Sequence, residues 1–227
     1  MSTLPINELY DHLTAVIIQR VVTIGTIGVD IGAHSGQIIR HIVRTAPHGS
    51  HVAVEPIPGL AAGLREQFPT VQVHEVALDA EGGREISFHH VVSNPAYSGL
   101  RERRYDRPNE TVEIISVRSA RLDDLVADGQ RVTFVKIDVE GGELGVLQGG
   151  LQMLAQQRPV VVFEHGLGAS DYYEIRPGDV CDLLVGSGLS DSLLQRFTAG
   201  EGPIGRGEFV RQFQECDNFF FVAYPLD

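Results

Sequence analysis

The feature that most constrains this fold is a strand-like run that ends in an acid and two spaced glycines. Residues 24–31 are rich in β-branched side chains, Asp30 precedes Gly32 and Gly36, and residues 38–45 follow with helical character. Strands buried on both faces of a parallel sheet favour such a run, and a glycine turn lets the backbone approach a ligand at a helix N-terminus. The pattern predicts a strand, a tight turn and a helix that form a nucleotide-type cradle.

The spacing of the glycines limits which ligand the turn can bind. A dinucleotide-binding loop usually has Gly-x-Gly-x-x-Gly and binds a pyrophosphate, whereas only Gly32 and Gly36 are placed here, behind Asp30. A carboxylate repels a pyrophosphate but suits an ammonium or a sulfonium group. The turn therefore favours S-adenosylmethionine over NAD, and the alternative is a strand-to-helix turn without a ligand.

A second acidic residue supports an adenosine ligand. Residues 51–56 form a short apolar run between turn-forming residues, and Glu55 lies 23 positions after Gly32. In a βαβ unit, an acid about 20 positions after the glycine turn accepts the ribose hydroxyls. The alternative is a solvated glutamate at a strand end.

The rest of the chain alternates strands and helices, which predicts a parallel sheet in one α/β domain spanning residues 1–227, with residues 1–22 as an N-terminal helical flank or lid. Helices are expected at residues 6–20, 37–46, 58–68, 122–126, 143–154, 179–184 and 208–214. Further strands are expected at residues 71–78, from Val132, and at 159–165, 193–197 and 219–224.

Residues 84–117 interrupt this alternation. Residues 84–92 and 111–117 have period-two patterning, and a charged, turn-rich stretch separates them. This predicts an antiparallel insertion whose loop, residues 94–109, is a mobile lid over the ligand site. The loop carries four arginines, Arg101, Arg103, Arg104 and Arg107. We favour solvated charges over a binding site for an anionic substrate.

A second strand end carries acids. Asp138 and Glu140 follow an apolar run and precede two glycines and a predicted helix, and such carboxylates face the crevice where open α/β sheets bind ligands. The strand at residues 159–165 ends in Glu164 and His165. If the two strands are neighbours, His165 comes within reach of Asp138.

Composition limits the partners and the compartment. A net charge of −12 argues against nucleic acid as substrate. The two cysteines, Cys181 and Cys216, have neither disulfide-framework nor thiolate-metal spacing, which indicates a reducing compartment. The apolar run at residues 13–31 is interrupted by Gln19 and Arg20 and lacks signal-peptide features, so we expect a cytoplasmic protein without a membrane span. The oligomeric state is not indicated.

Five motifs together resemble one family. They are VDIGAHSG at residues 29–36, VEP at 54–56, LDDL at 122–125, KIDVEGGE at 136–143 and NFFFVAYP at 218–225. The chain resembles the FkbM family of S-adenosylmethionine-dependent methyltransferases over residues 29–225, and KIDVEGGE after LDDL is the most specific part. The resemblance implies a class I methyltransferase (Rossmann-like) fold, with a seven-stranded, mostly parallel sheet and an antiparallel last strand. It also implies O-methylation of polyketides, sugars or glycolipids, which is typical of secondary metabolism.

The resemblance also implies roles for single residues. The methionine part of the cofactor would lie against Asp30, Gly32, Ala33, His34 and Gly36, the ribose against Glu55 and Pro56, and the adenine against Ala77 and Leu78. Asp138 would contact both the cofactor and the methyl-transfer site, where Glu140 also lies. The turn departs from the family's usual pattern at His34 and Ser35.

The favoured function is methyl transfer to a hydroxyl of a small molecule, with His165 or Asp138 as the base. One alternative is an amino-group methyltransferase that uses Asn94-Pro95-Ala96-Tyr97, which would require residues 84–92 to be the fourth strand. Others are a non-catalytic nucleotide-binding module and a nicotinamide-dependent oxidoreductase. The sequence does not identify the acceptor.

The sequence leaves open whether a general base or a metal ion activates the acceptor hydroxyl. Asp138, Glu140, Glu164 and His165 could form a general-base site or bind a divalent metal, since Mg²⁺ would relieve the repulsion between carboxylates. We favour a metal-free site because imidazole is a poor Mg²⁺ ligand.

Overall fold

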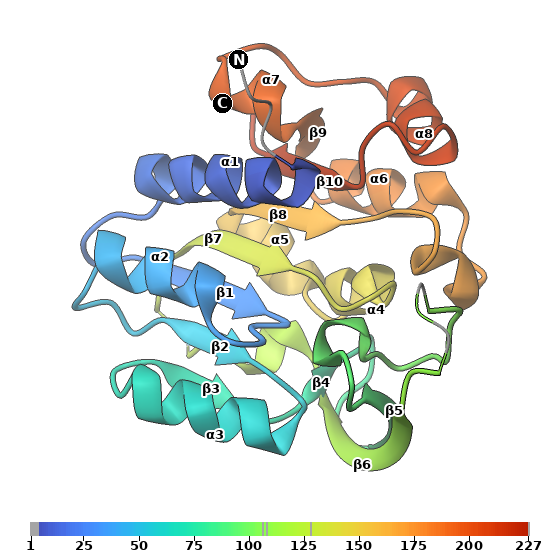
Figure 1. Cartoon of the computed structure of the whole chain (residues 1–227). Helices are drawn as coiled ribbons and strands as arrows, with labels where there is room; N and C mark the ends of the chain where they lie inside the picture. The colour runs from blue at the N-terminus through green and yellow to red at the C-terminus, as the bar shows by residue number, and fades with distance from the viewer. Residues whose placement is uncertain (1–4, 106, 108, 128, 227) are drawn as a thin grey trace.

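The computed structural model describes residues 5–105, 107, 109–127 and 129–226. A seven-stranded sheet in the order β3-β2-β1-β7-β8-β10-β9 runs through the molecule (Figure 1). Its strands are β1 Ile27–Ile31, β2 Val52–Val54, β3 Gln72–His74, β7 Val132–Ile137, β8 Val160–Glu164, β9 Ser190–Leu193 and β10 Phe220–Tyr224. Only β10 runs antiparallel to its neighbours, β8 and β9. This order and the antiparallel last strand confirm the predicted fold class.

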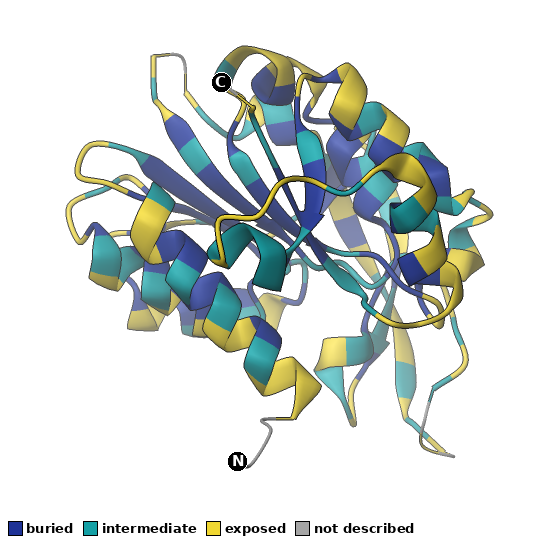
Figure 2. Cartoon of the chain, turned by 90° about the horizontal axis from the view of Figure 1, so that it is seen from above, coloured by how far each residue is buried: buried dark blue, intermediate teal, exposed yellow. Residues whose placement is uncertain are grey.

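Helices cover both faces of this sheet, and alternate strand residues point to each face. One face packs against α1 Ile6–Val21, α2 Gln37–Thr45, α3 Pro58–Gln67 and α7 Leu194–Thr198. The other packs against α4 Glu143–Gln148, α5 Leu151–Gln157, α6 Pro177–Gly186 and α8 Arg206–Gln214. Along β8, Val162 joins the first core and Phe163 the second. Figure 2 shows buried strands between helices whose outer faces are exposed.

The predicted insertion at residues 84–117 forms β5 Glu85–Val91 and most of β6 Val112–Ala120, which make a separate small sheet with β4 Ala77–Leu78. β5 and β6 are antiparallel, as the period-two pattern indicates. The small sheet lies beyond the ends of β1 and β2 (Figure 1), with the 3₁₀ helix η1 Pro95–Tyr97 beside it. Two further 3₁₀ helices are η2 Leu122–Asp124 and η3 Ser170–Tyr173. Residues 106 and 108 of the expected lid lie outside the described residues.

Two strand predictions are wrong. The run at 71–78 is not one strand, because β3 ends at His74 and Ala77 pairs with Ser119 in the small sheet. In the run at 193–197, Leu193 ends β9 and the rest is helical: Leu194 and Phe197 lie three positions apart and face the same core. Period-two and helical patterns are hard to distinguish in runs of four or five residues.

The helix expected at residues 143–154 is interrupted between α4 and α5 by Gly149 and Gly150. A Cβ atom on Gly149 would lie 2.4 Å from the carbonyl oxygen of Asp79. The helix therefore breaks where the backbone that follows β4 comes close.

The N-terminal flank belongs to the core over its described part. Tyr10, Ile17 and Ile18 of α1 are buried against the sheet and its neighbouring helices, while residues 1–4 lie outside the described residues. Among the described helices, none combines the length and the apolar character that crossing a membrane requires.

Candidate active site

A cavity of about 480 Å³ lies at the ends of β1, β2, β7 and β8, between α1 and the insertion. It is lined by nearly all the residues that the sequence assigns to a cofactor or to catalysis: Asp30, Gly32, Ala33, His34, Glu55, Pro56, Ala77, Leu78, Asp138 and Glu140. Gly36 and His165 do not line it. The two informative strand ends and the insertion thus meet at one place.

The glycine turn is shaped by close backbone contacts. Gly32 has φ +76°, and a Cβ atom there would lie 1.8 Å from the carbonyl oxygen of Asp138. Gly36 has φ +84°, and its Cβ would meet the Phe68 ring at 2.5 Å. Gly32 therefore brings β1 against the end of β7, whereas Gly36 provides room for α3 packing behind the turn.

Asp30 connects β1 to α2 and leaves one oxygen free. Its Oδ2 accepts a hydrogen bond from the Ile39 amide at 2.9 Å, so it caps the first turn of α2. Its buried Oδ1 has no hydrogen-bond partner among the described residues. Burial raises the pKa of Asp30 to about 6, against the opposing effect of Lys136. The free oxygen is suited to a cationic donor group.

Glu55 holds the turn to the end of β2. Its carboxylate accepts hydrogen bonds from the amides of His34 at 2.8 Å and Ile57 at 2.9 Å. Burial raises its pKa to about 7, although both amides favour the ionised form. Each oxygen keeps a lone pair for a further donor, so Glu55 can position the turn and bind a ligand.

Lys136 was not predicted as a site residue. It lies beside Asp30 on β1 and Val162 on β8, so its side chain shares their face of the sheet. Its Nζ contacts Asp138 Oδ2 at 2.7 Å. Burial alone would lower the pKa of Lys136, but the charges of Asp138 and Asp30 outweigh it and the pKa is raised. The available signal was a lysine within a buried strand, two positions before the acid it neutralises.

Glu164 and Asp138 form a carboxyl pair. Glu164 lies two residues beyond Val162 and therefore on the cavity side of β8. Burial and the charge of Asp138 raise the pKa of Glu164 well above its usual range. Burial would also raise the pKa of Asp138, but Lys136 and a hydrogen bond from Glu164 hold it below its usual value. The two carboxyl groups therefore interact as a pair in which the ionised form of Asp138 and the neutral form of Glu164 are favoured.

Glu140 and Arg103 lie beside the carboxyl pair, on the side of the insertion. They form an ion pair with both side chains mostly buried, and the Glu140 backbone is in the left-handed region, with φ +59°. Burial and the charge of Asp138 raise the pKa of Glu140 to about 8, while Arg103 opposes the shift. Arg103 also donates to the Gly168 carbonyl at 3.0 Å and covers the Tyr97 ring at 4.7 Å. Arg103 thus connects the insertion to the strand ends.

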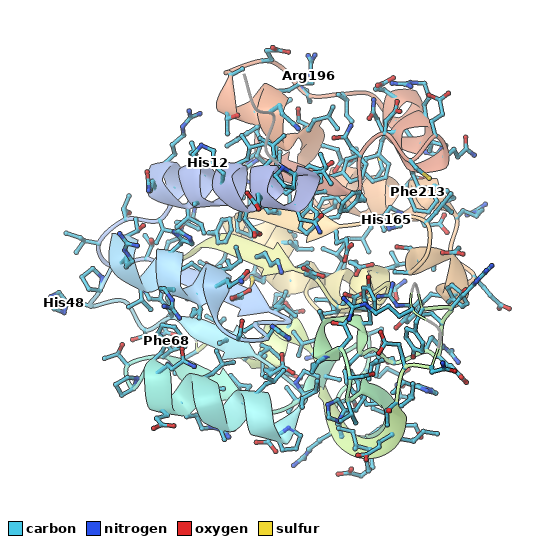
Figure 3. All side chains as sticks on the ribbon, viewed as in Figure 1. His12, His48, Phe68, His165, Arg196 and Phe213 are labelled. Atoms are coloured by element: carbon cyan, nitrogen blue, oxygen red, sulfur yellow. The ribbon has the colours of Figure 1, made fainter. Side chains whose placement is uncertain are left out.

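The expectation that His165 comes within reach of Asp138 is wrong. His165 is fully buried on the opposite side of β8, with its ring centroid 4.7 Å from that of Phe213 and 5.8 Å from that of Phe209 (Figure 3). Burial lowers its pKa to about 4. Consecutive strand residues alternate between faces, so when Glu164 faces the cavity His165 cannot.

Three carboxylates meet the geometric requirement for a metal site. Asp138, Glu140 and Glu164 each offer an oxygen within 4.8 Å of the others. Lys136 and Arg103 are already paired with two of them and supply positive charge where a cation would bind.

The amino-group alternative requires residues 84–92 to be the fourth strand of the sheet, and this is wrong. Residues 84–92 belong to the small sheet, and the fourth strand of the main sheet in sequence order is β7, which carries KIDVEG. Pro95, Ala96 and Tyr97 do line the cavity, but Asn94 does not.

Comparison with known proteins adds independent findings. The family model described as the methyltransferase FkbM domain matches residues 30–180. The 2-O-methyltransferase NoeI of Sinorhizobium fredii is 28% identical over 150 residues, which span 57% of this chain and 59% of that protein.

Two solved structures illustrate the likeness in fold. A candidate rRNA methylase from Clostridium thermocellum superposes with a TM-score of 0.52 and 9% identity, covering 100% of this chain and 99% of its own. A precorrin-6y C5,15-methyltransferase from Geobacter metallireducens gives a TM-score of 0.46 and 14% identity, covering 93% and 86% of the two chains. At 9% identity, the likeness to the Clostridium thermocellum structure supports the fold alone.

Proposed function

This chain belongs to the methyltransferase FkbM domain family, and on that premise we propose that it transfers a methyl group from S-adenosylmethionine to a hydroxyl oxygen of a small molecule. The observation that carries the proposal is the position of Asp138 in the cavity wall, with Lys136 Nζ 2.7 Å from its carboxylate and a Glu164 oxygen within 4.8 Å of it. The 2-O-methyltransferase activity in the name of the NoeI relative supports oxygen as the acceptor atom. The net charge of −12 supports a small molecule over a nucleic acid.

The cavity residues fit S-adenosylmethionine. The free Oδ1 of Asp30 suits an ammonium group, Glu55 can accept from ribose hydroxyls, and Ala77 and Leu78 offer apolar surface for an adenine. The volume of the first cavity, about 480 Å³, falls within the usual range of small-molecule sites, roughly 300–1,000 Å³. When bound, the cofactor would supply a methyl group activated by a sulfonium.

The chain's own residues have to remove one proton and exclude water. Asp138 accepts the proton that the acceptor hydroxyl loses, and Lys136 keeps Asp138 ionised until then. Glu164 stabilises the same carboxylate by donating its proton in a hydrogen bond. A positioned base of this kind contributes about 10²- to 10⁴-fold to the rate.

Turnover with unfractionated acceptors tests the proposal. The protein is incubated with S-adenosylmethionine and pools of small hydroxylated metabolites, and S-adenosylhomocysteine formation and acceptor masses are followed together. We expect S-adenosylhomocysteine to form in step with one methylated product. Tight binding of S-adenosylhomocysteine with no turnover in any pool would favour the non-catalytic module, and binding of NAD instead would favour the oxidoreductase.

Replacing Glu55 with alanine is expected to raise the dissociation constant for S-adenosylhomocysteine about 10- to 100-fold. The loss corresponds to a charge-assisted contact of about 1.5–3 kcal/mol. Calorimetry measures it, with Glu75→Ala as the control, because Glu75 pairs with Arg65 outside the cavity. Wild-type affinity in Glu55→Ala would remove Glu55 from the cofactor site.

We expect methyl transfer to persist after exhaustive chelation, because Lys136 and Arg103 already pair with carboxylates of the cluster. The measurement is the initial rate before and after chelation, and again after Mg²⁺ addition. A rate that is abolished by the chelator and restored by Mg²⁺ would instead make Asp138, Glu140 and Glu164 metal ligands.

A further inference from the structure

A second cavity of about 250 Å³ adjoins the first. Four residues line both cavities: Tyr97, Arg103, Glu164 and Phe219. No residue of the glycine turn or of the VEP motif lines the second one. The second cavity therefore reaches Glu164 of the carboxyl pair, whose partner Asp138 lines the first cavity, without passing through the part of the first cavity assigned to the cofactor.

The walls of the second cavity suit a ring that carries polar substituents. Aromatic rings come from Tyr97, Phe213 and Phe219, and main-chain groups come from residues 166–169. Gly166 is required by the approach of Phe219, whose Cβ would lie 2.8 Å from an added Cβ atom. Apolar ring faces and a few directed polar groups are typical of small-molecule sites.

The charge of the second cavity is opposite to that of the chain. Arg103 and Arg104 line it, and Glu164 is the one acid among its described lining residues. The Arg103 guanidinium is fixed by Glu140 and the Gly168 carbonyl. The Arg104 guanidinium has no hydrogen bond or ion pair with any residue that the structure describes, although its backbone amide donates to the Tyr172 hydroxyl at 3.0 Å. In a chain of net charge −12, this wall offers a cation to an incoming ligand.

We propose that the second cavity binds the methyl acceptor, and that this acceptor carries a carboxylate or phosphate that Arg104 binds while its hydroxyl reaches Asp138 beside Glu164. The inference rests on the proposed function and specifies its substrate class. Of the loop arginines, Arg103 and Arg104 face a cavity, while Arg101 and Arg107 line neither of the two.

Cys216 provides a reporter inside this cavity. It is an exposed free thiol among the lining residues, whereas Cys181 is buried and burial raises its pKa to about 12. Alkylation with iodoacetamide should therefore modify Cys216 selectively. We expect the modified protein to lose at least about tenfold in turnover with the active metabolite pool while its affinity for S-adenosylhomocysteine is unchanged. Full turnover after complete modification would overturn the acceptor assignment.

The acidic group is tested by comparing two reagents at Cys216, anionic iodoacetate and neutral iodoacetamide. Because Arg104 and Cys216 line the same cavity, Arg104→Gln should lower the ratio of the iodoacetate rate to the iodoacetamide rate. The upper limit is about fivefold, the effect of one unit charge at close contact, about 4 Å, in water. Arg107→Gln is the matched control, since it removes the same charge from the same loop outside both cavities. An equal change in both variants, or none in Arg104→Gln, would exclude an anion-binding wall.

The same variants separate this inference from the proposed function. If S-adenosylhomocysteine binds and turnover occurs, but Arg104→Gln does not raise the KM of the active acceptor, the substrate class is wrong and the methyltransferase stands. Absence of both binding and turnover in wild type would remove the proposed function, and the acceptor assignment with it. A KM raised about tenfold or more in Arg104→Gln, with kcat retained, supports both.

Discussion

Replacement of Asp138 with asparagine is expected to lower kcat for methyl transfer by about 10²- to 10⁴-fold, since the amide cannot accept the hydroxyl proton. The substitution keeps the size of the side chain and its oxygen toward Lys136, whose Nζ lies 2.7 Å from the carboxylate. Steady-state kinetics and S-adenosylhomocysteine calorimetry on the same preparation separate catalysis from binding.

The control for this variant is Asp182→Asn, which removes a carboxylate that pairs with Arg206 at the surface. A surface ion pair contributes about 0–1 kcal/mol to stability, so kcat should not change. If Asp138→Asn lost only cofactor affinity and kept kcat, Asp138 would be a binding residue and the base would have to be sought elsewhere in the cluster.

The second large effect is expected from Gly32→Ala. Gly25 and Gly32 both have positive φ, +85° and +76°, but an added Cβ atom meets nothing within 4 Å at Gly25 and lies 1.8 Å from the Asp138 carbonyl oxygen at Gly32. Gly25→Ala should cost about 1–2 kcal/mol of unfolding free energy, the strain of a left-handed residue. Gly32→Ala adds a backbone clash, so we expect a loss above about 4 kcal/mol and no measurable cofactor binding.

Urea unfolding of wild type and both alanine variants measures these free energies, and the Gly25 variant isolates the clash from the strain. Equal losses in the two variants would mean that β1 and β7 do not approach as closely at Asp138 as the structure has them. The glycine turn and Asp138 would then not be held together by this backbone contact.

The cradle could be predicted from the sequence because its determinants are local. Asp30 lies in the last two residues of β1, Gly32 directly follows β1 and Glu55 directly follows β2, and in a parallel sheet these strand ends lie at the same edge. The insertion could be predicted for the same reason, since the sequences of β5 and β6 alternate with period two over seven and nine residues. Both predictions depend on patterns that extend over a whole element.

The prediction for His165 is wrong because a shift of one residue along the strand decides which side chain faces the cavity. His165 and Glu164 are adjacent, and which of them faces the cavity depends on strand pairing that composition does not specify. Lys136 was missed because a buried lysine becomes a site residue only when Asp30 and Asp138 are known to flank it. The second cavity could not be predicted, because residues near positions 97–104, 166–169 and 213–219 form it together.

Methyl transfer to oxygen is tested most directly by the position of a labelled methyl carbon in the product. The protein is given S-adenosylmethionine labelled with carbon-13 in its methyl group, and the purified product is examined by carbon–proton correlation NMR. We predict a single labelled methyl group bonded to oxygen, absent when Asp138→Asn replaces wild type. A labelled methyl group bonded to nitrogen or carbon would contradict the account.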